Sequence, residues 1–493
     1  MSEYKHGAYG ELGESILREP SECAIVPVYV GTAPAHRTGG PVNEPVLVKT
    51  MAQARTVLGY DEDWASYTLC EAMHAHFAGD DPVGPIVLIN VFNPEEFKAA
   101  SDTTKAAVPG TIAGFVLADM GKAILSTIKV GAEAASLKYT ARYDEATKKV
   151  RLVPKAGTVV PATSAISYRE LGTVTLTEAK VIGAASDKGE STGVYAVDKV
   201  YQATGRVPFT LLAPGFSQIK AVREALVSAS QRVNGHWYAH VRCDLPLNSA
   251  GTAVTVDTAA AIKASLGYTS EGECAHWPMG RRTKTERGAQ VARVYHLSTL
   301  AAAAQMRLDR QNGDVPYESV DNKPLDIDGI VLDGGKSGLF GPETLNKYLT
   351  QHGIDSALYW GGIWRSWGSH TAAVLDGEAE DPRALYAANI RMLYYLINWF
   401  QARFGDEIGK PYTKNRGQSI RAETQAYLDA LRGQGALVKG ECALAMGDNP
   451  LTDVLAGAIH FDIATTNTPP LRSLGATLRF DETGLELIWP KEE

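Results

Sequence analysis

The sequence lacks the features of several protein classes. Among its 493 residues, no apolar run reaches the ~20 residues of a membrane-spanning helix. No apolar segment follows a basic start at the N-terminus, so no secretory signal is expected. The formal net charge of -8 argues against the basic face that nucleic-acid binding needs. We therefore expect a chain made in the cytoplasm, with no direct nucleic-acid partner and no insertion into a membrane.

Common catalytic motifs are also missing. There is no G-x-S-x-G, no P-loop, no dinucleotide fingerprint and no H-E-x-x-H. His74 and His76 are two residues apart on a predicted helix, so their side chains point to different sides and are poorly placed to bind the same metal ion. The glycine-rich stretch 334–338 resembles a phosphate loop only in composition, and we interpret it as a turn. The sequence predicts no enzyme, no metal site and no cofactor.

Cysteine is scarce, with five residues and no CxxC pair or zinc spacing. They are Cys23, Cys70, Cys243, Cys274 and Cys442. Buried, reduced thiols are the usual state of such residues in a cytosolic protein. The odd count leaves intermolecular pairing open.

What the sequence does contain is typical of a folded protein of about two to four domains, with 45% hydrophobic and 21% charged residues. Apolar runs at 23–30 and 85–92 predict buried strands, and helical patterns at 51–58 and 67–77 lie between them, which is an α/β layout. We expect six segments: an N-terminal arm 1–20, a first core part 21–98, an inserted β-rich domain 99–205, an α/β middle domain 206–345, a C-terminal core domain 346–475 and a C-terminal arm 476–493.

Finer predictions follow from shorter patterns. Within the inserted domain we expect strands at 136–143, 150–153, 173–177 and 195–200. Helices are expected at 217–233, 258–266, 290–308, 343–353, 384–404 and 419–433, with 384–404 the longest. The chain ends in a predicted hairpin of 476–480 and 485–489, which needs a partner sheet because two strands alone are marginal.

Two further clusters allow more than one interpretation. The tryptophan-rich stretch 360–368 is either a platform for a sugar or base, or an anchor that packs two domains together, which we favour. The basic stretch 280–287, with Arg281, Arg282, Lys284 and Arg287, is either a solvated loop or a docking patch for an acidic partner.

Several segments together resemble contractile-tail sheath proteins. The resemblance begins with His6-Gly7, Gly10, Glu14 and 30–34, continues through 41–48, 58–59, 211–215, 244–246, 288–293 and 316–325, and ends with 345–346, 353–354, 367–371, 389–392, 435–437, Asn449, Asp453, Gly457 and 469–470. No one of these is diagnostic, but their order spans nearly the whole chain. After Pro470 the sequence departs from the family pattern, which leaves the path of the C-terminal arm open.

This resemblance implies a structural subunit of a contractile tail sheath. The implied fold is a multidomain α/β (α+β) one with a subtilisin-like middle domain and arms that add strands to neighbouring subunits. The implied partners are further copies of the chain in stacked rings, an inner tail tube protein, and baseplate and tail terminator proteins. The implied location is the virion, after synthesis in the host bacterial cytoplasm. Phage tail and R-type bacteriocin both fit.

The resemblance also suggests roles for individual residues. The arm residues expected at inter-subunit contacts are Tyr4, His6, Tyr9, Leu478, Phe480, Leu485, Leu487 and Trp489. The basic stretch 281–287 becomes a candidate contact with the tube or a neighbour. Intermolecular disulfides become a hypothesis for the five cysteines, with Cys23 and Cys442 favoured. Two rival functions are a shell or layer protein that assembles into flat sheets or closed shells, and a hydrolase built on the middle domain.

Overall fold

The computed structural model describes residues 24–286 and 288–488. Its centre is an eight-stranded sheet in the order β2-β3-β1-β11-β12-β15-β20-β21. The six inner strands run parallel, and the edge strands β2 and β21 are antiparallel to their neighbours. The strands are β1 Ile25–Gly31, β2 Pro45–Val48, β3 Ile86–Asn90, β11 Val207–Leu212, β12 His240–Asp244, β15 Glu273–His276, β20 Ile354–Trp360 and β21 Ile363–Trp367.

Helices cover both faces of this sheet, which is why its inner strands are continuous apolar runs. Val28 and Val30 of β1 belong to the larger core, whereas Tyr29 between them belongs to the second core on the opposite face. The larger core receives α6 Lys220–Ser230, α7 Ala259–Leu266 and α10 Ala387–Phe404; the second receives α1 Met51–Leu58, α2 Thr68–Phe77 and α8 Leu297–Gln311. The buried strands predicted at 23–30 and 85–92 are confirmed.

The sheets divide the chain differently from the predicted ranges. Segments 21–98, 206–345 and 346–475 all contribute strands to the eight-stranded sheet. β1 pairs with β11, which lies about 180 residues further along the chain, on the far side of the insertion. The periodicity of a sequence indicates that a segment is a strand but does not show which strand it pairs with. The prediction therefore assigned to three domains the strands that the fold brings into one sheet.

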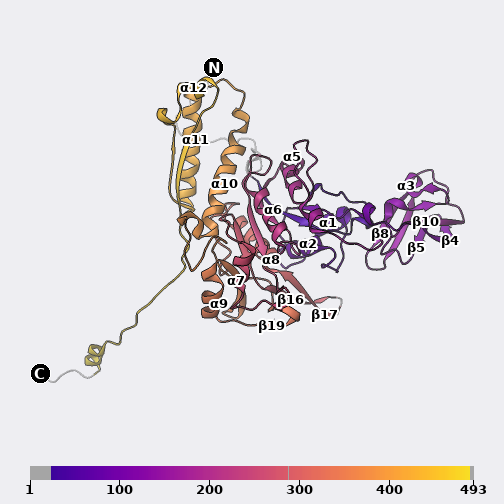
Figure 1. Ribbon diagram of the computed structural model, residues 1–493, viewed down its shortest axis with the longest axis horizontal. Coiled ribbons are helices and arrows are strands. Elements are labelled where there is room, and N and C mark those ends of the chain that lie inside the picture. Colours follow the sequence, from indigo (N-terminus) through magenta and orange to yellow (C-terminus); the bar gives the residue numbers. More distant parts are fainter. Residues whose placement is uncertain (1–23, 287, 489–493) are drawn as a thin grey trace, which may run out of the picture.

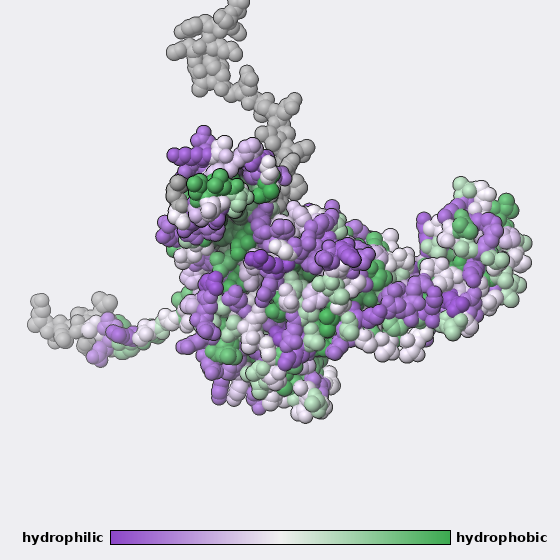
Figure 2. Space-filling view, turned by 45° about the horizontal axis from the view of Figure 1, so that its top comes forward, coloured by the Kyte–Doolittle hydropathy of each residue, from purple (hydrophilic) through white to green (hydrophobic). Residues whose placement is uncertain are grey.

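The inserted β-rich unit is a lobe with its own seven-stranded sheet, in the order β7-β6-β10-β4-β5-β9-β8 (Figures 1 and 2). Phe115, Leu152 and Ile166 belong to a core that is separate from those of the body. Its elements are β4 Thr103–Thr111, β5 Gly114–Leu117, β6 Lys129–Val130, β7 Glu133–Ala134, α3 Ala135–Lys138, β8 Tyr139–Asp144, β9 Lys149–Pro154 and β10 Thr163–Tyr168.

The predicted strands at 173–177 and 195–200 are wrong. Residues 173–177 form no strand, and Gly193–Lys199 is a 3-10 helix (η4) followed by α5 Val200–Thr204. Val194, Val197 and Val200 are buried against the main sheet, at the spacing of a helical face. Together with α4 Glu178–Ile182 they return the chain to the body before residue 205.

Two predictions are wrong in the region of a long hairpin. Its strands are β16 Met279–Glu286 and β17 Ala289–His296. The stretch 280–287, expected as a loop, lies in β16 as far as Glu286, and the helix expected from residue 290 begins only at Leu297. The remaining elements of this region are β13 Asn248–Ser249, β14 Thr252–Ala253, β18 Gly329–Val331, β19 Ser337–Gly338 and α9 Pro342–Tyr348.

The C-terminal part stands beside the body as a helical column (Figure 1). It contains α10, α11 Lys414–Gly433, α12 Leu451–Leu455 and a two-stranded sheet of β22 Leu437–Ala443 and β23 Asp462–Asn467. The longest helix is α11, with 20 residues, and not the predicted 384–404, which corresponds to α10 with 18 residues. The predicted terminal hairpin is wrong for the described residues, because 468–480 form no strand and Glu482–Leu487 is a 3-10 helix, η10.

Candidate assembly surfaces

The two-stranded sheet β22–β23 is stabilised from one side by α11. Leu428 and Leu431 of the helix share a core with Leu437 and Cys442 of β22. The side chain of Gln425 donates to the carbonyl of Gly440 (3.0 Å) and accepts from the amide of Cys442 (2.9 Å). Gln425 therefore satisfies backbone groups of β22 that point away from β23, and so blocks part of that edge.

The other edge of this sheet is open. Among the described residues no strand pairs with β23 except β22. Along β23, exposed residues alternate with half-buried ones, from Asp462 to Asn467. An unpaired edge is a template for a strand of another chain. The sequence did not predict that Gln425 binds the backbone of β22, because a glutamine in a helical pattern does not indicate which backbone groups its side chain will contact.

The chain leaves this sheet in a segment that exposes apolar side chains. The exposed fractions of Leu478 and Phe480 are 97% and 84%, and Leu471, Leu474 and Ile488 are similarly exposed. Of the other predicted arm residues, Leu485 and Leu487 lie in η10, whereas Tyr4, His6, Tyr9 and Trp489 lie outside the described residues. An exposed apolar segment of this kind is typical of chains that are completed by a partner.

The basic cluster does not form a free cationic patch. Arg281 is paired with Asp328 (2.8 Å), and Lys284 with Asp80 (2.8 Å). Arg282 is only 5% exposed, forms an ion pair with Asp326 (2.6 Å) and lies over the ring of Tyr295. These arginines and this lysine therefore stabilise the β16 hairpin within the chain; Arg287 lies outside the described residues.

The described thiols are all free and buried: Cys70, Cys243, Cys274 and Cys442. Even Cys442, favoured for cross-linking, is only 4% exposed because it faces α11. Burial raises the pKa of each of these thiols, which suppresses the reactive thiolate. Their burial argues against the predicted intermolecular disulfides for these four, while Cys23 lies outside the described residues.

The pair Cys274 and His240 does not have the properties of the activated nucleophile that the hydrolase alternative would need. Cys274 Sγ lies 3.5 Å from His240 Nε2, and both residues are buried. Burial raises the pKa of the thiol and lowers the pKa of the imidazole, so the pair stays neutral, the reverse of an activated cysteine. Ser217 and Ser298 both donate to the carboxylate of Asp244, and among the described residues neither hydroxyl is hydrogen-bonded to a histidine.

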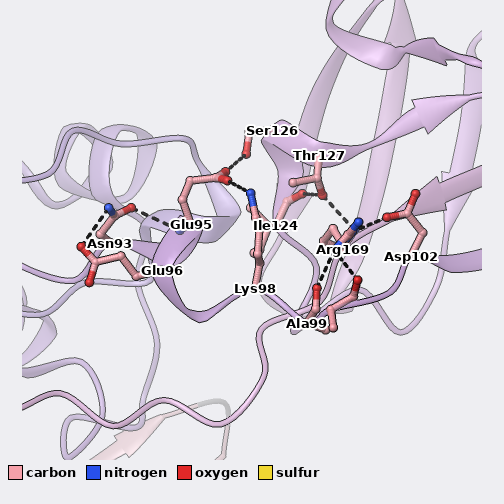
Figure 3. Close-up of polar contacts among 11 residues, drawn as sticks. Asn93, Glu95, Glu96, Lys98, Ala99, Asp102, Ile124, Ser126, Thr127 and Arg169 are labelled. Carbon is pink, nitrogen blue, oxygen red and sulfur yellow. Dashed lines mark hydrogen bonds and ion pairs between the residues drawn. The ribbon is translucent and has the colours of Figure 1, made fainter.

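The neck, where the chain passes between the body and the inserted lobe near Lys98 and Arg169, carries the polar contacts drawn in Figure 3. On the body side, Glu95 accepts from Lys98 (3.0 Å) and from Ser126 (3.1 Å) of the lobe. On the lobe side, Arg169 is bonded to Asp102 and donates to the carbonyls of Ala99 (2.8 Å) and Ala100 (2.7 Å). The two chain crossings are thus held side by side, and Lys98 bridges to Leu171.

Residues 24–286 and 288–488 contain neither a cluster of metal ligands nor a helix suited to a membrane. No group of three or more histidine, cysteine, aspartate or glutamate side chains is arranged to hold a metal ion. No helix in these residues is both long enough and apolar enough to cross a membrane.

Comparison with known proteins adds what the geometry alone lacks. No family model matches the chain. A tail sheath protein of Burkholderia phage BcepMu is 23% identical over 461 residues, which cover 90% of each chain. The chain is a homologue of a tail sheath protein. The resemblance found in the sequence motifs is thereby confirmed.

Solved structures agree on the fold. The sheath complex of an extracellular contractile injection system, PVC, in its contracted state matches with a TM-score of 0.56 at 12% identity, covering 98% of this chain and 99% of the other. A chain of the six-fold symmetrised baseplate of the anti-feeding prophage matches with a TM-score of 0.53 at 12% identity, covering 96% and 100%. The mixed α/β multidomain sheath fold is therefore shown.

Proposed function

We propose that this chain is the structural subunit of a contractile tail sheath. The observation that carries the proposal is the match over 90% of both chains to a phage tail sheath protein. In this function, copies polymerise around an inner tube in a metastable extended state. Their contraction drives the tube through a bacterial envelope, for genome ejection or killing.

The open edge of β23 and the exposed C-terminal segment support a linkage by strand addition. In our proposal, an arm of one subunit pairs with β23 of a neighbour, because that edge carries unsatisfied backbone groups and the arm carries exposed apolar side chains. Backbone pairing of this kind holds subunits together while their bodies rotate, since the arm and the body are separate units.

The proposed partners follow from the same function. They are further copies of this chain, an inner tube protein, and baseplate and tail terminator proteins. The relatives are structural proteins of sheath and baseplate assemblies, which supports a structural role and not a catalytic one. The proposed place of action is the particle itself.

Electron microscopy of the purified full-length chain tests this function. We expect hollow tubes with a wide lumen and a helical surface. Flat layers or closed shells would favour the shell-protein alternative instead. Only compact monomers, at high concentration and after addition of an inner tube protein, would contradict the proposal.

A further inference from the structure

The tip of hairpin β20–β21 exposes three large apolar side chains. The exposed fractions are 49% for Tyr359, 57% for Trp360 and 41% for Ile363. Trp360 and Ile363 face each other across the turn residues Gly361 (φ 62°) and Gly362 (φ 86°). Two positive φ values are the signature of the tight hairpin turn that matches the twist of the strands.

This tip is held firmly. Arg365 donates from Nε to the carbonyl of Trp360 (3.3 Å) and from Nη1 to the carbonyl of Asn322 (2.9 Å). The next pair along the hairpin, Tyr359 and Trp364, places the ring of Trp364 in the core, where it is only 8% exposed. The tryptophan-rich stretch thus splits into a buried anchor and an exposed tip. Exposed, rigid aromatic groups are typical of binding hot spots.

The same chain carries an apolar groove of about 490 Å³ at another place. Met51 at the start of α1, Phe77 at the end of α2, and Val83 and Pro85 before β3 form its apolar lining. Arg310 lies at this groove and donates to the carbonyl of Gly84. A guanidinium beside an apolar groove favours an aromatic occupant, because the ring face attracts a cation.

The groove and the tip lie at opposite corners of the main sheet. The groove lies where β3 begins, beside the edge strand β2, and the tip lies where β20 ends, beside the edge strand β21. Since β3 and β20 run in the same direction and five strand spacings of ~4.8 Å separate them across the sheet, the groove and the tip lie on the order of 25 Å or more apart. The tip of a chain therefore cannot reach the groove of the same chain, so a contact between the two features requires a second copy.

We infer that the Trp360 tip of one subunit docks into the groove lined by Met51, Phe77 and Val83 of a neighbouring copy. The inference rests on the proposed function, because it needs copies that assemble. A contact between two different patches is heterologous, so it repeats from copy to copy and generates a ring or a helix. The tip and the groove lie at diagonal corners of the sheet. Each docked copy is therefore displaced from the previous copy both across and along the strands, as in a helical array.

Substitutions on each side test this contact. Trp360→Ala should raise the protein concentration at which tubes appear by about tenfold or more, the loss expected for a hot-spot tryptophan. Pro82→Arg, which places a charge at the exposed rim of the groove, should have a similar effect. The matched control is Ile112→Ala, which removes an equally apolar side chain, 98% exposed, from the inserted lobe. Unchanged melting curves of the monomers would verify that the variants fold.

Cross-linking between two singly substituted chains gives an independent readout. In a Cys23→Ser background the remaining thiols are buried, so Trp360→Cys chains mixed with Pro82→Cys chains should form disulfide-linked dimers in tubes. The control mixture is Trp360→Cys with Ile112→Cys. Tubes with cross-links no greater than in this control, or a Trp360→Ala threshold within twofold of the original chain, would overturn the docking inference alone. Absence of tubes from the unsubstituted chain would instead overturn the proposed function.

Discussion

The inserted lobe and the β22–β23 sheet are both peripheral β-structures, but they differ in completeness. The lobe has seven strands and a core in which Phe115, Leu152 and Ile166 are at most 1% exposed. The β22–β23 sheet has two strands, depends on α11 for its core, and is followed by a segment that exposes Leu478 and Phe480. Two strands alone are marginal, whereas a larger sheet with an apolar face is stable by itself.

We propose that this difference bears on assembly. The lobe has a core of its own and does not depend on a neighbour for its stability, although β7 and β8 are edge strands of its sheet and Ile112 and Val159 are exposed. A unit with an open edge gains both backbone hydrogen bonds and apolar burial when another chain adds a strand. The comparison supports the proposed strand addition at the C-terminal column, which does not require the lobe.

Truncation after Thr468 should give the largest effect. Without the exposed apolar segment, the monomer should keep its melting temperature, while tubes should be lost because the proposed strand donor is gone. The control is a chain in which a short linker replaces residues 99–171, whose neighbouring ends are bridged by Lys98 and Leu171. Electron microscopy and sedimentation measure both. Loss of tubes in the control, or tubes from the truncated chain, would break the comparison.

A matched pair of core substitutions should give an intermediate effect. Leu152→Ala in the lobe and Leu428→Ala under β22 each remove a side chain that is at most 1% exposed. Each should cost about 2–5 kcal/mol of local unfolding free energy. Only Leu428→Ala should also raise the concentration needed for tubes, which denaturant melts and sedimentation together can establish. Equal effects of the two on assembly would contradict the division of roles.

A smaller effect is expected from pH, and its origin lies in the body. Burial alone would lower the pKa of His296, but Glu71, 2.7 Å away, and Asp244 raise it to about 9. The stability from the protonated form is therefore full below pH 6.5 and is lost as the pH rises through 9. The melting temperature of the monomer should fall over this interval, and His296→Gln should flatten that dependence. A fall of the same size in the variant would show that another group is responsible.

The smallest effect is expected from thiol chemistry. Because the four described thiols are buried, a thiol reagent should label them slowly in the folded chain and rapidly in denaturant. Non-reducing gels of tubes from a Cys23→Ser chain should show monomers only. Cross-linked bands in that chain would restore the disulfide hypothesis that the burial of Cys442 argues against.

The sequence predicted local structure well where local signals were complete. The helix at 51–58 has its expected bounds because the side chain of Thr50 caps the amide of Gln53, and Gly59 ends it with φ 80°. Long-range pairing could not be predicted in the same way. The stretch 280–286 has a loop-like composition, but its backbone pairs with β17 and β18, and its cations form ion pairs with Asp326, Asp328 and Asp80 from distant segments.

The assembly surfaces were predicted only in outline. The exposed arm followed from the lack of a local core, and the tryptophan cluster was visible in the sequence. Which tryptophan is exposed could not be predicted, because that depends on the two-residue turn at Gly361 and on the loop that carries Asn322. That the β22 edge is covered and the β23 edge is not could not be predicted either, because the contact of Gln425 with β22 is tertiary.

The neck at Lys98 and Leu171 has a consequence for how such chains can diverge. Since the two crossings are bridged to each other, an excursion of about 70 residues closes between neighbouring points, like a short surface loop. The lobe can then be enlarged, exchanged or lost without altering the order of strands in the main sheet. A foreign domain inserted between Lys98 and Leu171 should accordingly be displayed at the periphery of an otherwise unaltered scaffold.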